Sequence, residues 1–130
     1  RDGWSQSAQD SSDGGVAVAL AECCFGARDR EALGGESEAP GSASDSVEAV
    51  LFGEAAGRVV LATSNPDALT AAARDAGLDC RRVGRTGGDR LTVRSPSSHT
   101  PTSPTLWLDG EVSRLEQIWR RAIPRRLEQT

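Results

Sequence analysis

The sequence predicts an α+β fold, in which a mixed β-sheet is covered by helices in an α/β/α sandwich. Helical and strand-like segments follow each other in a mixed order rather than in strict alternation, which favours such a sheet. Residues 90–94 alternate polar and apolar side chains, as a half-buried strand does. Near the C-terminus, apolar residues recur three and four positions apart, which indicates an amphipathic helix packed on a sheet.

A chain of 130 residues has room for one domain, and we expect a single domain over residues 1–130. Hydrophobic residues make up 37% of the chain, so the core must come from a few short segments. Stretches rich in Gly, Ser and Pro predict two long loops, at about 27–47 and 95–104.

The segment Val16–Phe25 predicts a largely buried helix, because alanines favour the helical state and almost no charge interrupts the run. Gly26 follows at a position that can end this helix. Ser12 or Asp13 is expected to cap its N-terminus, since either side chain can accept a hydrogen bond from an amide of the first turn.

The middle of the chain predicts two strands and a second helix. Two apolar runs of strand length, Ala49–Phe52 and Arg58–Thr63, are spaced as a hairpin or as two neighbouring strands. Ala68–Ala76 is alanine-rich, and the preceding Ser64–Asp67 supplies an Asn and a Pro that together favour a helix start.

The last third of the chain predicts a small set of strands and a closing helix. The expected elements are a strand at 79–84, a turn at 86–89, a strand at 90–94, a short extended segment at 105–108 and a helix at 111–122. Pro124 is expected to break that helix, because proline has no amide hydrogen to donate. Trp119 lies on its apolar stripe and is expected in the core.

Charge excludes several function classes. The formal charge is −4, so binding to a nucleic acid is not expected. All fifteen basic residues are arginine, which excludes a phosphate-binding, Schiff-base or general-base lysine.

The arginines near the C-terminus form either a basic patch or, more simply, the solvated face of the last helix. Glu54 and Arg58 are expected to form a surface ion pair of small energetic weight or to mark a domain contact.

Neither a disulfide framework nor a metal site is expected. Cys23, Cys24 and Cys80 cannot all pair with one another, and His99 lies far from them in the sequence. The cysteines are interpreted as small buried hydrophobic residues.

No apolar run approaches the length of a membrane span or signal peptide, so we expect a cytoplasmic protein without a membrane partner. The chain starts at Arg1 and contains no Met, which favours a fragment or a processed chain.

Four segments carry a resemblance to a known family. Residues 7–22 read SAQDSSDGGVAVALAE and resemble the SAHDxSDGGLAVALAE segment of the last domain of phosphoribosylformylglycinamidine synthase, synthetase subunit. Residues 51–54 and 57–59 resemble its LFGE and GRV motifs, and residues 83–91 resemble its IGxxGGxxL hairpin. The final helix resembles LxxxWxxALP through Leu115, Trp119, Ala122, Ile123 and Pro124. The chain is thus similar to the C-terminal domain shared by aminoimidazole ribonucleotide (AIR) synthetase and related enzymes.

The resemblance implies an AIR synthetase C-terminal-domain-like fold and a role in purine biosynthesis. In that family, ATP with Mg²⁺ phosphorylates the amide oxygen of formylglycinamide ribonucleotide, and ammonia from a glutaminase partner then displaces the phosphate. The implied partners are N-terminal domains of the same protein, a glutaminase subunit and a small bridging subunit. The family's catalytic histidine and metal carboxylates lie in other domains, so this chain is expected to contain no catalytic or metal residues, to be inactive alone and to hold no tightly bound cofactor.

One segment of the chain is a candidate ligand site. A glycine pair lets backbone amides approach an anion, and a helix N-terminus attracts one; nearby carboxylates favour a nucleotide that arrives with Mg²⁺. The simpler interpretation is a helix cap. The candidate ligand-binding residues are Gln9, Asp10, Ser12, Asp13, Gly14 and Gly15. Gln9 replaces the usual histidine of the last domain, although the first half of these enzymes has a substrate-contacting glutamine there.

Two alternatives stay open from the sequence. The chain could be a free-standing nucleotide-binding or assembly module without catalysis, or the equivalent domain of another enzyme of the AIR synthetase superfamily. Two departures from the family also stand out: Gly35–Glu38 lacks the apolar residues of the strand expected after the first helix, and the loop at 95–104 resembles an insertion.

Overall fold

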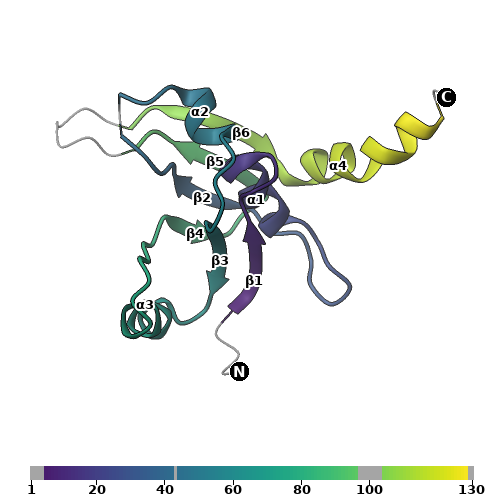
Figure 1. Cartoon of the computed structure of the whole chain (residues 1–130). Helices are drawn as coiled ribbons and strands as arrows, with labels where there is room; N and C mark the ends of the chain where they lie inside the picture. Colours follow the sequence, from purple (N-terminus) through teal and green to yellow (C-terminus); the bar gives the residue numbers. More distant parts are fainter. Residues whose placement is uncertain (1–4, 43, 97–103, 129–130) are drawn as a thin grey trace.

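A computed structural model describes residues 5–42, 44–96 and 104–128 (Figure 1). The tip of the loop at 95–104, with His99, lies outside the described residues. The elements are β1 (Ser5–Asp10), α1 (Gly15–Cys24), β2 (Gly35–Glu38), α2 (Val47–Phe52), β3 (Val59–Thr63), α3 (Pro66–Asp75), β4 (Gly84–Thr86), β5 (Arg90–Arg94), β6 (Leu106–Glu111) and α4 (Val112–Leu127).

The strands form two sheets. A four-stranded sheet has the order β4-β2-β5-β6, and in it β2 and β5 run parallel while the other neighbours are antiparallel. A separate antiparallel pair joins β1 to β3, with Asp10 opposite Val59. The sheet is therefore mixed, and the α+β class is confirmed.

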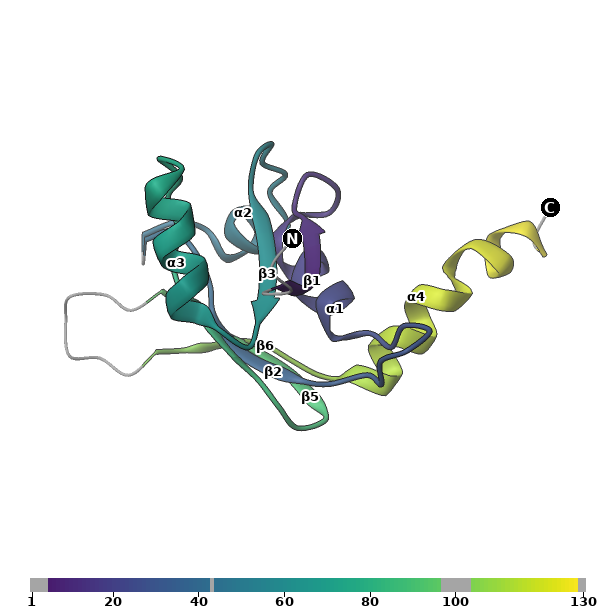
Figure 2. The same ribbon diagram turned by 90° about the horizontal axis from the view of Figure 1, so that it is seen from below.

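The elements are layered on the four-stranded sheet. α1, α2 and the β1–β3 pair lie on the same side of it (Figure 2). α4 follows directly after β6, and its second half extends away from the body in both views (Figures 1 and 2). The N-terminal half of the chain therefore builds the layer that packs on the sheet formed largely by the C-terminal half.

The core lies between α1 and the four-stranded sheet. α1 buries Val16, Ala17 and Leu20, and β5 contributes Leu91 and Val93 from the apolar side of its alternating sequence. A fully buried leucine contributes about 2 kcal/mol from its removal from water. The predicted buried helix and the predicted alternating strand at 90–94 are both confirmed.

The helix α3 also confirms its prediction from the sequence. It begins at Pro66, and the Asn65 side chain accepts a hydrogen bond from the Ala68 amide at 3.2 Å. Asparagine at the cap and proline in the first turn therefore start the helix as expected. None of its residues is fully buried, so its packing contributes less than that of α1.

The predicted strand at Ala49–Phe52 is wrong, because these residues belong to α2. The Ser46 side chain accepts a hydrogen bond from the Ala49 amide at 3.2 Å and caps the helix. Val50 and Leu51 are both buried, so two neighbouring side chains reach the core from a helical backbone. The predicted hairpin is also wrong, since β3 pairs with β1.

Two further strand predictions are corrected. The loop expected at about 27–47 contains β2, which lies between β4 and β5 and pairs through its backbone on both sides. Residues 79–83 form no strand. Gly84–Thr86 forms the strand that pairs with β2, and the Val83 carbonyl oxygen before it accepts a hydrogen bond from the Glu38 amide at 2.7 Å. Gly84 permits this pairing because a side chain there would collide with the Glu36 carbonyl oxygen. Backbone contacts rather than apolar side chains thus define this edge of the sheet.

The closing helix differs from its prediction in two respects. Pro124 lies inside α4, which continues to Leu127 instead of breaking. Trp119 is 49% exposed rather than in the core. Its ring lies 5.5 Å from the Phe25 ring, and its Nε1–H donates to Glu22 Oε1 at 3.2 Å. The residue therefore joins α4 to α1 at the surface.

Packing in the core is testable with a matched pair of leucines. Leu91→Ala should lower the free energy of unfolding by about 3 kcal/mol, because the side chain is 2% exposed and its loss leaves a cavity. Leu78→Ala is the control, since Leu78 is 67% exposed, and it should change stability by less than about 0.5 kcal/mol. Urea denaturation measures both, and equal effects would contradict the described core.

Thiol reactivity tests the burial of Cys24. Burial raises the pKa of Cys24 to about 11, from an ordinary value of 9.0. At pH 8 the folded protein should therefore show about 100-fold less Cys24 thiolate than the unfolded chain, and correspondingly slow reaction with a disulfide reagent. The neutral thiol favours the folded state below pH 9, and this contribution is lost as pH rises toward 11. If Cys24 reacted as fast in the folded protein in water as in the protein unfolded by urea, the described burial of Cys24 would be contradicted.

Candidate functional site

The candidate site is the turn that joins β1 to α1, residues 10–15. The Asp10 side chain accepts a hydrogen bond from the Ser12 amide at 2.9 Å, which closes a local turn. Two further hydrogen bonds join the turn to a distant part of the chain. The buried Ser11 donates from its amide and from its hydroxyl to the Arg58 carbonyl oxygen, at 3.0 and 3.1 Å. The turn is therefore fixed to the segment that leads into β3.

The backbone of Gly15 lies against the backbone at the end of α2. Its φ is +80°, in the left-handed region that favours glycine. A β-carbon at Gly15 would lie 2.7 Å from the Leu51 carbonyl oxygen and from the Phe52 Cα. Only glycine satisfies both conditions, so the start of α1 rests directly on the end of α2.

A second contact links the same two regions. The Gly14 amide donates to Glu54 Oε1 at 3.3 Å, so a carboxylate from the segment after α2 lies at the N-terminus of α1. This contact was not predicted from the sequence, and the described residues contain no ion pair between Glu54 and Arg58. The SDGG and LFGE motifs, separated by some forty residues, thus form one structural unit.

The predicted site residues differ in how far the structure exposes them to solvent. Asp10 lies on the exposed face of β1 and Gln9 on its half-buried face, as expected for neighbours in a strand. Ser12 and Gly14 are half-buried, Gly15 is buried and Asp13 is exposed. The predicted cap by Ser12 or Asp13 is wrong, because the N-cap is Gly14 and α1 has no side-chain cap hydrogen bond.

The turn can offer a metal-bound nucleotide one free carboxylate. Asp10 already accepts the Ser12 amide, whereas Asp13 is exposed and has no hydrogen-bond partner in the described part of the chain. Mg²⁺ commonly binds through one or two carboxylates together with substrate phosphates. The residues fit a contributing ligand rather than a complete metal site. Among the described residues, no group of three or more His, Cys, Asp or Glu side chains is placed to hold a metal ion.

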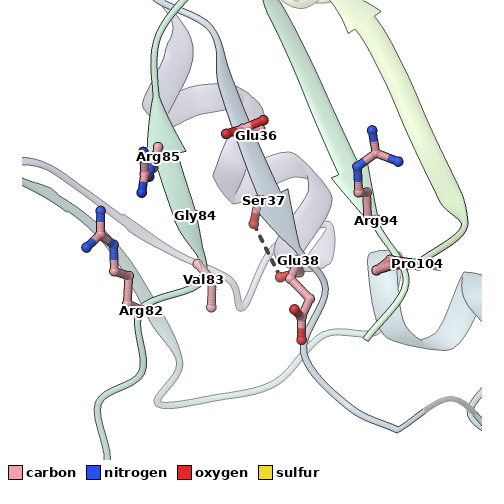
Figure 3. Close-up of a pocket in the computed structure, with 9 residues that line it drawn as sticks. All are labelled: Glu36, Ser37, Glu38, Arg82, Val83, Gly84, Arg85, Arg94 and Pro104. Carbon is pink, nitrogen blue, oxygen red and sulfur yellow. Dashed lines mark hydrogen bonds between the residues drawn. The ribbon is translucent and has the colours of Figure 1, made fainter. Parts of the chain in front are cut away.

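A separate hollow lies away from the turn, on the four-stranded sheet (Figure 3). It is open and measures roughly 460 Å³. Arg82, Arg85 and Arg94 line it together with Glu36 and Glu38. This hollow could not be predicted from the sequence, because its charges come from β2, β4, β5 and the segment before β4, and the pairing of these strands was not predicted. Its mixed charges give it no clear preference for an anion or a cation.

Comparison with known proteins places the chain in a family. The family model for "AIR synthase related protein, C-terminal domain" matches residues 1–95, which include the turn and all elements from β1 to β5. The chain belongs to this family. The AIR synthase-related fold expected from the sequence motifs is therefore confirmed, and none of its helices in the described ranges is long and apolar enough to cross a membrane.

The AIR synthase-related domain is similar to subunits named phosphoribosylformylglycinamidine synthase subunit PurL. It is 34% identical to that of an Anaeromyxobacter species over 95% of the chain, 40% identical to that of Thermomicrobium roseum over 89%, and 46% identical to that of Salinibacter ruber over 72%. The matched regions cover 16%, 14% and 12% of those subunits, respectively. The chain thus spans about a sixth or less of the length of these relatives.

The contact at Gly15 is testable with a second glycine as control. Gly15→Ala should destabilise the domain by about 3 kcal/mol or more, because it adds a steric collision to the cost of a left-handed backbone. Gly57 has a similar φ of +77° but nothing within 4 Å of an added β-carbon, so Gly57→Ala should cost only about 1 kcal/mol. Urea denaturation separates the two, and equal costs would show that the α1–α2 contact is not tight.

Proposed function

We propose that this chain is the C-terminal domain of an ATP-dependent phosphoribosylformylglycinamidine synthase subunit. The similarity to PurL subunits over most of the chain carries this proposal. The family match supports it independently, because it covers the turn and the elements that hold it. The chain is too short a part of such a subunit to act alone, so its activity belongs to the longer protein.

The proposed reaction converts an amide to an amidine. ATP phosphorylates the amide oxygen of formylglycinamide ribonucleotide, and ammonia released from glutamine displaces that phosphate, which yields ADP and inorganic phosphate. Mg²⁺ supplies charge neutralisation of the phosphates. The proposed partners are the N-terminal domains of the same protein, a glutaminase subunit and a small bridging subunit, all in the cytoplasm.

Within that enzyme, we assign the turn at residues 10–15 to the ligand side of the domain. Its backbone is held by Arg58, Leu51 and Phe52, so the turn can keep its shape when a ligand binds. Asp13 points its free carboxylate to solvent, where phosphate-bound Mg²⁺ could share it. Gln9 and Ser12 are the remaining candidates for ligand contacts from this domain.

A domain-swap chimera tests the proposal. In the Salinibacter ruber relative, the segment that matches this chain would be replaced by residues 1–130. The chimera should restore growth without purines to a strain that lacks the synthase subunit, and the purified protein should form the amidine with ATP and glutamine. The isolated chain should do neither. A well-folded chimera without activity would contradict the proposal.

Asp13→Ala in this chimera tests the turn itself. We expect a loss of activity of about tenfold or more, because a ligand to the phosphate-bound metal is removed. In the isolated chain the same substitution should leave the melting temperature within about 1 °C, since Asp13 forms no cap. Asp79→Ala, also at an exposed position, is the control and should leave both unchanged. A lower melting temperature for Asp13→Ala would indicate a structural role instead.

A further inference from the structure

The outward face of α4 carries a row of basic residues interrupted by one isoleucine. Arg114, Ile118, Arg121 and Arg125 stand at positions i, i+4, i+7 and i+11 of the helix. At 100° per residue these four side chains share an arc of about 60° and extend over about 16 Å of helix. We call these four residues the α4 stripe.

The opposite side of α4 is fixed to the body of the domain. Val112 is buried, and Trp119 contacts Phe25 and Glu22 of the α1 region. Arg120 donates to the Gly26 carbonyl oxygen at 3.1 Å and to Glu116 at 2.6 Å. These contacts hold the orientation of the helix, so the α4 stripe faces away from the domain.

The charges of the α4 stripe have no partner in the described part of the chain. Arg114, Arg121 and Arg125 are exposed and make no ion pair or hydrogen bond there, whereas Arg120 pairs with Glu116. Arg121 and Arg125 also repel each other at i, i+4, which disfavours an isolated helix. Ile118 lies between Arg114 and Arg121 in the row and is 61% exposed. The row therefore combines uncompensated positive charge with an exposed apolar side chain.

We propose that the α4 stripe is a docking surface for an acidic protein partner. Charge complementarity requires a row of carboxylates opposite the three arginines, and Ile118 requires a small apolar site among them. A helix of the partner that packs along α4 can present carboxylates and an apolar side chain at the spacing of the three arginines and Ile118. This surface is separate from the turn at residues 10–15 and does not depend on the function proposed for it.

Two other partners fit these observations less well. A nucleic acid offers phosphates but no apolar site for Ile118 at its backbone, and the chain as a whole carries a charge of −4. A membrane requires one continuous apolar face. Ile118 and Leu127, the latter 71% exposed, are nine residues apart and so lie on opposite sides of the helix. A protein surface is the partner that the α4 stripe matches.

An NMR titration of the isotope-labelled chain tests the proposal. The probe is an alanine-based helical peptide with glutamates at i, i+7 and i+11 and a leucine at i+4. Amide shifts should concentrate on α4, and R114E/R121E/R125E should weaken binding by about tenfold or more. R28E/R74E/R81E makes the same charge change at other exposed positions and should alter binding by less than about twofold. Ile118→Ser should weaken peptide binding severalfold, and circular dichroism verifies the fold of each variant.

Several results would overturn the proposal. The peptide could bind R114E/R121E/R125E as well as the original chain, or shift only residues outside α4. A DNA duplex or anionic lipid vesicles could bind α4 more tightly than the peptide, with no effect of Ile118→Ser. Sedimentation could show self-association of the chain that R114E/R121E/R125E abolishes, in which case a second copy occupies the stripe.

Discussion

The approach of Gly15 to the backbone of Leu51 and Phe52 is the contact on which the arrangement of the N-terminal half depends. It requires a residue with a left-handed backbone and no side chain, and both requirements hold at the same position. Because α1 starts there, the contact fixes the helix that carries most of the core onto the end of α2. The same contact sets where the turn from β1 must pass.

This constraint explains why the candidate site is built mainly from backbone. The turn is held by Ser11 on Arg58 and by Gly14 on Glu54, and its only free carboxylate is that of Asp13. Such an element can orient part of a ligand but cannot surround one. A site completed by other domains agrees with a chain that covers 12% to 16% of its PurL relatives.

The sequence predicted those elements whose side chains alone determine their state. α1, α3 and β5 were predicted from alanine content, an Asn-Pro start and strict alternation, and all three are confirmed. α2 was predicted as a strand because a short apolar run does not distinguish the two states without its Ser46 cap. β1 and β2 are polar strands that pair through their backbones, so side-chain patterns gave no signal for them.

Only part of the candidate site was predicted, again because side-chain patterns carry no signal for contacts made through the backbone. The motif identified the turn and its glycines, but the cap assigned to Ser12 or Asp13 was wrong because Gly14 and the distant Glu54 occupy that position. Contacts between segments forty residues apart cannot be read from local pattern. The hollow on the four-stranded sheet emerged only from the three-dimensional arrangement, whereas a basic patch on the last helix was one of two interpretations open from the sequence.

Hydrogen–deuterium exchange in the domain-swap chimera tests the central claim most directly. Exchange of the peptide that covers residues 9–18 would be compared with and without Mg-ATP. If the turn faces the ligand, its amides should become more protected when nucleotide is bound, while those of α3 stay unchanged. Unchanged exchange in the turn of an active chimera, or protection confined to residues 82–94 at the sheet hollow, would contradict the account.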